Sequence, residues 1–193
     1  MKPRRLPILD WMSRETVRAL LVWSENRVRH RDLAVETGSD YGRMLVNDGR
    51  AHADDVAPMD PSPGVERISQ YRPPIGEVVM HEVRERLIEE AEQYMVAANS
   101  FYRIYGSSDQ LVRHTDRDEL DYTVTIMLGL YGMPSWSIWA DVDGVDMEIP
   151  MAPGDAVLIT GRIYPHWREP LPQHAQAATL YLHYSVGTDP SNG

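Results

Sequence analysis

The sequence contains no cysteine among its 193 residues. Disulfide bonds, thiolate metal ligands and cysteine nucleophiles are therefore excluded. The chain also lacks any apolar run as long as the roughly 18–20 residues that a membrane-spanning helix requires. We therefore expect a soluble cytoplasmic protein without a membrane partner.

Positive charge is scarce, since 19 Lys and Arg residues face 29 Asp and Glu residues, for a formal net charge of −10. Binding to nucleic acid depends on clustered basic side chains that neutralise phosphates, so this balance argues against a nucleic-acid partner. The hydrophobic fraction of 42% and the charged fraction of 25% are ordinary for a globular protein. The length suffices for one domain with a sizeable core, and we expect a single domain over residues 1–193.

The N-terminal half, residues 1–99, reads as a layer of helices and loop. The segment Ser13–Arg29 is a predicted helix, with a serine N-cap followed by apolar residues at helical spacing. An apolar stripe predicts a second helix over Ile75–Ala98. Between them, Thr37–Pro74 is rich in Gly, Pro and Asp. A loop of this length in a compact domain usually has a function, so we expect a lid that contributes to specificity.

After residue 99 the pattern changes to short runs that are typical of strands and are separated by turn signals. Asp143-Gly144, between two such runs, is a strong hairpin signal. The predicted strands are Phe101–Tyr105, Gln110–His114, Tyr122–Leu130, Trp136–Asp141, Val145–Ile149, Ala156–Thr160, Tyr164–Arg168 and Ala177–Ser185. Together they favour a mainly β fold: a double-stranded β-helix, or jelly-roll barrel, over residues 100–186, with the N-terminal helices packed on one sheet.

The most informative motif is His114-Thr115-Asp116, followed by His166. Residues i and i+2 of a strand point to the same face, so His114 and Asp116 can bind one metal ion, and His166 from a neighbouring strand can complete the set. Two histidines and one carboxylate leave coordination positions open, an arrangement typical of non-haem Fe(II) oxygenases. A second His-x-Asp motif, His52-Ala53-Asp54, lies in the loop-rich segment, and the more rigid strand context favours His114.

The segment Pro153–Pro170, which contains His166-Trp167-Arg168-Glu169-Pro170, and the later Leu182-His183-Tyr184 carry a family resemblance. They resemble the Gly-Asp strand and distal-histidine region of the Fe(II)/2-oxoglutarate-dependent oxygenase superfamily, in particular small bacterial members with a His-Trp-Arg-x-Pro signature. The resemblance covers residues 100–186. It implies a double-stranded β-helix, Fe(II) bound by His114, Asp116 and His166, and O₂ activation coupled to decarboxylation of 2-oxoglutarate.

One feature of that family is missing here. Its members usually carry an Arg or Lys on the last core strand, which anchors the distal carboxylate of 2-oxoglutarate, with Ser or Thr two positions later. This chain has Ala177 and Thr179 at those positions. Arg168 shares the face of His166 by the two-residue period, and guanidinium groups bind carboxylates bidentately, so we predict Arg168 as the anchor. An alternative is that Arg168 forms a salt bridge with Glu169 or another acid.

The same alternation turns Thr179, Tyr181 and His183 of the last strand into the barrel, and Gln176 and Leu180 away from it. We predict that Thr179 and Tyr181 line the cosubstrate pocket with Arg168. Further candidates for the pocket wall are Tyr105, Tyr122 and Arg103.

The leading hypothesis is a 2-oxoglutarate-dependent dioxygenase that hydroxylates a small molecule, such as an amino acid or a natural-product intermediate. Desaturation and cyclisation use the same ligands, and a protein side chain is an alternative substrate. Asp116 argues against a halogenase, because a halide ion needs a vacated ligand position. One alternative is an Fe(II) oxygenase that does not use 2-oxoglutarate and binds a substrate carboxylate through Arg168. Another is a jelly-roll binding protein whose metal pocket is unused.

Overall fold

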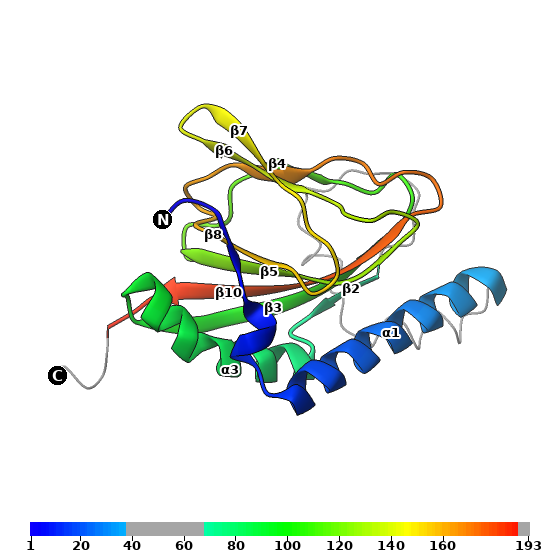
Figure 1. The fold of residues 1–193 in the computed structure, drawn as a ribbon, viewed down its shortest axis with the longest axis horizontal. Coiled ribbons are helices and arrows are strands. Elements are labelled where there is room, and N and C mark those ends of the chain that lie inside the picture. Colours follow the sequence, from blue (N-terminus) through cyan, green and yellow to red (C-terminus); the bar gives the residue numbers. More distant parts are fainter. Residues whose placement is uncertain (38–67, 189–193) are drawn as a thin grey trace.

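The computed structural model describes residues 1–37 and 68–188, which form two facing antiparallel β-sheets with helices on the outside of the larger sheet (Figure 1). The six-stranded sheet has the order β1-β8-β5-β10-β3-β2. Its strands are β1 (Arg4–Leu6), β2 (Ile68–Tyr71), β3 (Met95–Tyr105), β5 (Tyr122–Tyr131), β8 (Ala156–Ile159) and β10 (Gln176–Val186). These two sheets are the jelly-roll barrel predicted from the sequence.

The four-stranded sheet has the order β4-β9-β6-β7 and carries the predicted metal motif. Its strands are β4 (Leu111–His114), β6 (Ile138–Val142), β7 (Val145–Ile149) and β9 (His166–Arg168). The hairpin between β6 and β7 turns at Asp143 and Gly144, whose φ angles of 58° and 83° are both positive. Positive φ at both central residues is what a type I′ turn requires, and this hairpin prediction is confirmed.

A short 3-10 helix, η1 (Ile8–Trp11), and the helices α1 (Arg14–Thr37) and α3 (Pro74–Ala91) cover the outer face of the larger sheet (Figure 1). Ser13 caps α1 as predicted, since its Oγ accepts a hydrogen bond from the Thr16 backbone N–H at 3.0 Å. The helices and the outward residues of the sheet share one apolar cluster, which includes Leu20, Leu87 and Leu180. None of the described helices is long and apolar enough to cross a membrane.

The second predicted helix is too long. It ends at Ala91, because Glu92 adopts a left-handed conformation with φ 53° and the chain then enters β3 at Met95. Met95, inside the predicted helix, is buried on a strand. The short strands β1 and β2 were not predicted, and β2 lies inside the segment predicted as loop. The rest of the predicted lid, with His52-Ala53-Asp54, lies outside the described residues.

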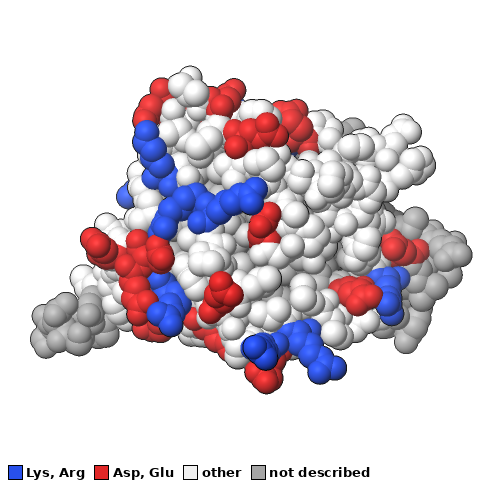
Figure 2. All heavy atoms as spheres, in the orientation of Figure 1, with Lys and Arg blue, Asp and Glu red and all other residues white. Residues whose placement is uncertain are grey.

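A second, inner apolar cluster fills the space between the two sheets and includes Tyr105, Trp136 and Tyr181. The outer surface is different in character: on the face drawn in Figure 2, basic and acidic side chains are interspersed. Three N-terminal cations each pair with an acid: Lys2 with Asp143, Arg4 with Glu90, and Arg5 with Asp155.

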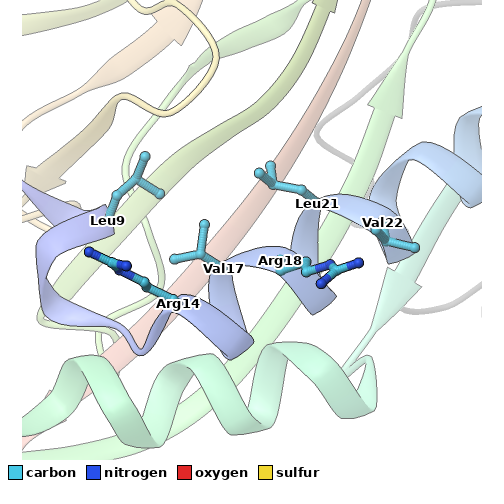
Figure 3. Close-up of a pocket in the computed structure, with 6 residues that line it drawn as sticks. All are labelled: Leu9, Arg14, Val17, Arg18, Leu21 and Val22. Carbon is cyan, nitrogen blue, oxygen red and sulfur yellow. The ribbon is translucent and has the colours of Figure 1, made fainter.

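An open, mostly apolar hollow lies on the outer face of the helical layer, between η1 and α1 (Figure 3). It is lined by Leu9, Arg14, Val17, Arg18, Leu21 and Val22. The hollow belongs to η1 and α1, whereas the predicted metal motif belongs to β4, β9 and the loop after β4, so the two are different places on the molecule.

Candidate metal centre

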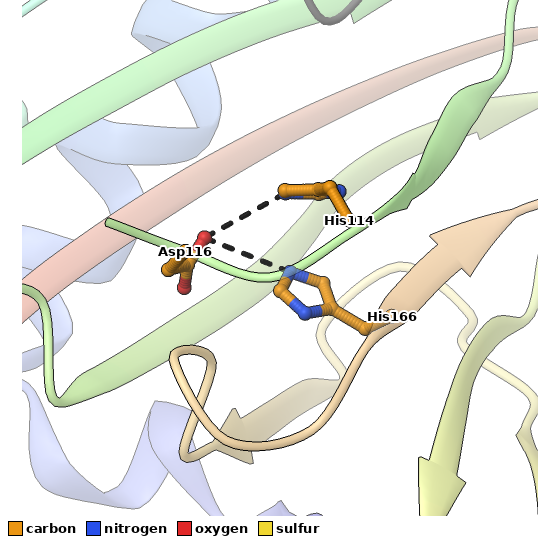
Figure 4. Close-up of side chains that lie close together, drawn as sticks. All are labelled: His114, Asp116 and His166. Carbon is orange, nitrogen blue, oxygen red and sulfur yellow. Dashed lines mark ion pairs between the residues drawn. The ribbon is translucent and has the colours of Figure 1, made fainter. Parts of the chain in front are cut away.

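The three predicted metal ligands come together, with the side chain of Asp116 close to both histidine rings (Figure 4). His114, the last residue of β4, lies directly opposite His166, the first residue of β9. The Oδ1 atom of Asp116 lies 3.6 Å from Nε2 of His114 and 3.8 Å from Nε2 of His166. One ligand atom from each of the three residues lies within 4.8 Å of the others, close enough to bind a single metal ion.

Asp116 differs from the expectation in one respect, because β4 ends at His114 and the aspartate is not itself on the strand. The backbone N–H of Asp116 instead donates to the carbonyl of Gly161, 2.9 Å away, in the turn that follows β8. The carboxylate is therefore placed by a contact between two loops and not by strand alternation alone.

Both histidines present Nε2 to the site because their other ring nitrogen is already used. Nδ1 of His114 bonds the carbonyl of Val112 at 2.8 Å, and Nδ1 of His166 bonds the carbonyl of Tyr164 at 3.1 Å. A carbonyl can only accept, so each Nδ1 carries the hydrogen and each Nε2 keeps a lone pair for a metal ion.

The protonation states of the site also suit a cation. Burial lowers the pKa of His166 to about 4, because the ring is only 3% exposed. Burial would raise the pKa of Asp116, but the favourable interactions of its carboxylate with His114 and His166 outweigh burial and hold this pKa below its usual range. For His114 burial acts to lower the pKa, and the pairing with Asp116 outweighs burial and raises it. Near neutral pH, His166 is thus neutral and Asp116 ionised, as metal ligands must be.

Thr123, on the inward face of β5, orients the aspartate. Its hydroxyl donates to Oδ2 of Asp116 at 2.5 Å, which leaves Oδ1 facing the two histidines. Nothing in the sequence indicates this role, since a threonine inside an apolar strand is ordinary.

We expect Thr123→Val to weaken Fe(II) binding about 10- to 100-fold, because partners that orient a ligand typically contribute that much. The affinity can be measured by anaerobic equilibrium dialysis. Thr125→Val is the matched control, since Thr125 lies on the same face of β5 and is equally buried, but pairs with Tyr181 and Val157. An equal loss in both variants would contradict a specific role for Thr123.

Arg168 is buried inside the barrel with no acid beside it. Its side chain is 1% exposed, and its Nη1 donates to the carbonyl of Trp136 at 2.7 Å while Nη2 contacts the Met151 sulfur at 3.0 Å. The guanidinium also stacks over the Trp136 ring at 4.7 Å. Its Nε is buried without a hydrogen-bond partner.

The alternative of a salt bridge between Arg168 and Glu169 is not observed. Glu169 instead accepts a hydrogen bond from the Trp167 indole at 3.0 Å, and among the described residues no carboxylate forms an ion pair with Arg168. Burial lowers the pKa of Arg168, yet a guanidinium remains charged in proteins. A buried cation without a counter-charge is costly, which is the physical reason to expect an anionic ligand here.

Four further residues predicted for the pocket lie on the inner face of the larger sheet: Tyr105, Tyr181, Thr179 and Arg103. The hydroxyls of Tyr105 and Tyr181 are 2.7 Å apart, and burial raises the pKa of Tyr105. Thr179 is fully buried on β10, opposite Arg103 of β3 and Met127 of β5, and its hydroxyl donates to the carbonyl of Arg103 at 3.4 Å. Arg103 lies over the rings of Phe101 and Tyr105, at 5.4 and 5.3 Å.

Tyr122 does not join this group. It faces the helical layer, where its hydroxyl donates to Gln93 at 3.0 Å and its ring belongs to the outer apolar cluster. The prediction chose the wrong face of β5, whose inward residue at this level is Thr123. By contrast, Leu180 lies in the outer cluster and Tyr181 in the inner one, as the alternation on β10 predicted.

The two facing sheets with a His-x-Asp…His cluster between them were compared with known proteins. No family model matches the sequence, and no curated protein matches it. Solved structures do match. The non-haem α-ketoglutarate-dependent epimerase SnoN from nogalamycin biosynthesis is 10% identical, with TM-score 0.64, over 96% of this chain and 77% of that one.

Two more solved structures align along nearly all of this chain. A Pseudomonas putida prolyl-4-hydroxylase is 14% identical, with TM-score 0.60, over 96% of this chain and 93% of that one. AviO1 from Streptomyces viridochromogenes Tue57 is 15% identical, with TM-score 0.59, over 93% of this chain and 88% of that one. At such identities the likeness establishes the fold, and the chemistry has to be argued from the side chains of this chain.

Proposed function

We propose that this protein is a non-haem Fe(II) dioxygenase that uses 2-oxoglutarate and O₂ to oxidise a small molecule. The observation that carries the proposal is the pairing, on one three-residue strand, of a metal-binding histidine with a buried guanidinium that lacks an anion. His166 and Arg168 are the two ends of β9 and face the same side. A cosubstrate that chelates a metal ion at one end and carries a carboxylate at the other fits this pair.

The residues present suit ferrous iron. His114, Asp116 and His166 would hold it, with Thr123 fixing the carboxylate through its hydrogen bond. Two imidazoles and one carboxylate on one side of the ion leave the other side for ligands. When bound, iron supplies O₂ activation coupled to the oxidative decarboxylation of 2-oxoglutarate. The protein's own part is to hold the reactants in place and to exclude water.

The residues present also suit 2-oxoglutarate. Two residues along a strand span roughly 6.6 Å, which is comparable to the distance between the ends of a five-carbon dicarboxylate. Arg168 would bind the distal carboxylate, and its orphaned Nε and the paired hydroxyls of Tyr105 and Tyr181 supply further polar contacts. The Trp136 ring under the guanidinium keeps it in place. In the family that this sequence resembles, an Arg or Lys on the last core strand binds the distal carboxylate. This chain has Ala177 at that position, and Arg168 would take over the role.

Hydroxylation of an amino acid or a natural-product intermediate is the reaction that we propose. The fold is shared by a prolyl-4-hydroxylase and by an epimerase of natural-product biosynthesis, so the fold itself permits several outcomes. Asp116, with its second oxygen held by Thr123, occupies the ligand position that a halogenase leaves to a halide ion. This favours oxygen transfer, or a desaturation or cyclisation that uses the same ligands.

The direct test is an anaerobic titration of the Fe(II)-loaded protein with 2-oxoglutarate, followed through the weak visible charge-transfer band of the chelate. We expect a saturable band, and formation of succinate once O₂ is admitted. Iron that stays bound while neither band nor succinate appears would contradict the proposal. That result would favour an Fe(II) oxygenase without 2-oxoglutarate, in which Arg168 binds a carboxylate of the substrate itself.

Arg168→Met should raise the Kd and the KM for 2-oxoglutarate about 10- to 100-fold, the loss expected for a hydrogen-bonded charge pair. Fe(II) affinity should stay within a few-fold, since Arg168 contacts none of the metal ligands. Arg113→Met is the matched control, because Arg113 pairs with Asp141 and Asp146 on the outer surface. A normal Kd for 2-oxoglutarate in Arg168→Met would rule out the anchor.

A further inference from the structure

A third histidine, His183, lies beside the metal centre without being one of its three ligands. His183 lies on the inward face of β10, and its Nδ1 is 3.0 Å from the side-chain nitrogen of Asn99 on β3. The two residues face each other across the strand pair, and Asn99 is buried at 6% exposure. A buried amide paired with a histidine fixes the ring in orientation and in hydrogen position.

The pairing determines which ring nitrogen of His183 carries the hydrogen. An amide nitrogen only donates, so Nδ1 of His183 accepts and its hydrogen resides on Nε2. His114 and His166 have the opposite arrangement, with Nδ1 donating to a carbonyl and Nε2 left as a lone pair. His183 is therefore built as a hydrogen-bond donor, whereas the other two histidines are built as metal ligands.

His183 also lies on the sheet that is opposite the two ligand histidines. Both ligand histidines come from the smaller sheet, and the inward residues of the larger sheet lie opposite them. At that level the inward residues of the larger sheet are Thr123, His183 and Asn99, which are neighbours in register on β5, β10 and β3. Thr123 touches Asp116, and His183 is the next inward residue across the sheet. The charge of Asp116 acts on His183, in opposition to burial, which lowers the pKa of His183.

The inward residues of β10 then lead from His183 toward Arg168. The rings of His183 and Tyr181 are nearly parallel, at 7° with their centroids 6.5 Å apart. The Tyr181 hydroxyl meets that of Tyr105, and both phenols act on the buried Arg168. The hydrogen-bond donor His183 thus lies near the metal ligands and the cation Arg168 lies farther along this inner surface. A 2-oxo dicarboxylic acid has one carboxylate for each of them.

We propose that His183 donates its Nε2 hydrogen to the carboxylate at the oxo-acid end of 2-oxoglutarate, with Asn99 as the residue that positions it. Arg168 binds the other end. This inference rests on the proposed function and adds to it, since the two ends of the cosubstrate are recognised by different residues. Asn99 acts only through the ring of His183.

The test uses two acids that share the chelating end. 2-Oxoglutarate has the distal carboxylate and pyruvate lacks it, so the ratio of their Kd values measures recognition of the far end alone. Both are titrated anaerobically into the Fe(II)-loaded wild type, His183→Leu, His183→Gln, Asn99→Leu and Arg168→Met, and the chelate band is followed. Iron content and the thermal midpoint of each variant are measured first.

His183→Leu should weaken both acids by the same factor, about 10- to 100-fold, because a donor to a charged group is lost at the shared end. The ratio of the Kd for pyruvate to the Kd for 2-oxoglutarate should stay at the wild-type value in His183→Leu. In Arg168→Met the same ratio should fall toward one. His183→Gln keeps an N–H donor and should bind both acids within a few-fold of wild type. Asn99→Leu should raise the Kd for both acids roughly 3- to 10-fold. The ring of His183 remains, but its hydrogen is no longer held on Nε2.

Normal binding of both acids by His183→Leu would overturn the inference and leave the proposed function standing. If His183→Leu binds pyruvate normally and loses only 2-oxoglutarate, His183 recognises the distal carboxylate and the inference is wrong. If His183→Gln binds both acids as weakly as His183→Leu, the N–H donor is not responsible for the effect. If the iron-loaded wild type itself gives no band with either acid, the proposed function fails, and that result is distinct from all the others.

Discussion

His166→Ala is expected to abolish metal binding and every activity that depends on it. His166 supplies one of three ligand atoms, and its ring is held in place by the bond between Nδ1 and the carbonyl of Tyr164. Loss of residues that only orient a ligand costs 10- to 100-fold in metal affinity, so loss of a ligand should cost roughly 100-fold or more. The expected result is a variant that retains little Fe(II) after anaerobic dialysis and forms no detectable succinate.

The fold of this variant should persist. The apolar clusters on both sides of the larger sheet do not include His166, and a truncation at the end of a short strand leaves them intact. His81→Ala is the matched control, because His81 is exposed on α3, in the helical layer outside the barrel. Circular dichroism should give the same spectrum for the wild type and both variants. A His166→Ala variant that binds Fe(II) with near-normal affinity would disprove the three-ligand site.

The sequence predicted which side chains share a face of one strand, because the alternation of side chains along a strand is a local property. His166 and Arg168 share a face since they are two residues apart, and the same period turned Tyr181 inward and Leu180 outward. The hairpin at Asp143-Gly144 was equally local. Each of these predictions needed only the identity of a few adjacent residues.

The choice of Tyr122 was wrong for a physical reason. The first seven residues of β5 are all buried, because one face packs on the helices and the other lines the barrel. A strand buried on both faces shows no polar alternation, so its sequence does not tell which parity faces the barrel. Only the register with β10, in which Thr123 lies beside His183, reveals the inward set.

Contacts between segments that are distant in the sequence could not be predicted either. The pair of Asn99 and His183 joins residues 84 positions apart, and the strands β1 and β2 exist only because longer strands offer them an edge. The change from helix to strand after Ala91 has no Gly or Pro to mark it, since Glu92 itself takes the left-handed conformation. Such features follow from tertiary packing, which periodicity does not encode.

Gly161→Ala should disable the metal site as thoroughly as removal of a ligand. A Cβ atom at position 161 would lie 1.8 Å from Oδ2 and 2.6 Å from Cγ of Asp116, far inside van der Waals contact. The carboxylate cannot swing away without leaving Thr123, and the backbone of Asp116 is tied to the carbonyl of Gly161 itself. We expect Fe(II) affinity to fall roughly 100-fold or more, because Oδ1 is carried away from the two histidines.

The effect should be confined to the site, and this separates it from general destabilisation. Gly161 is not among the described glycines with a positive φ, so alanine can adopt its backbone conformation. Fe(II) should raise the thermal midpoint of the wild type, since a ligand that binds only the folded state stabilises it, and should leave that of Gly161→Ala unchanged. Gly129→Ala is the control, because its Cβ would meet its nearest neighbours at 3.3 Å or more. If Gly161→Ala binds Fe(II) normally, the Asp116 carboxylate does not occupy the position from which the metal site is inferred, and the ligand set has to be reassigned.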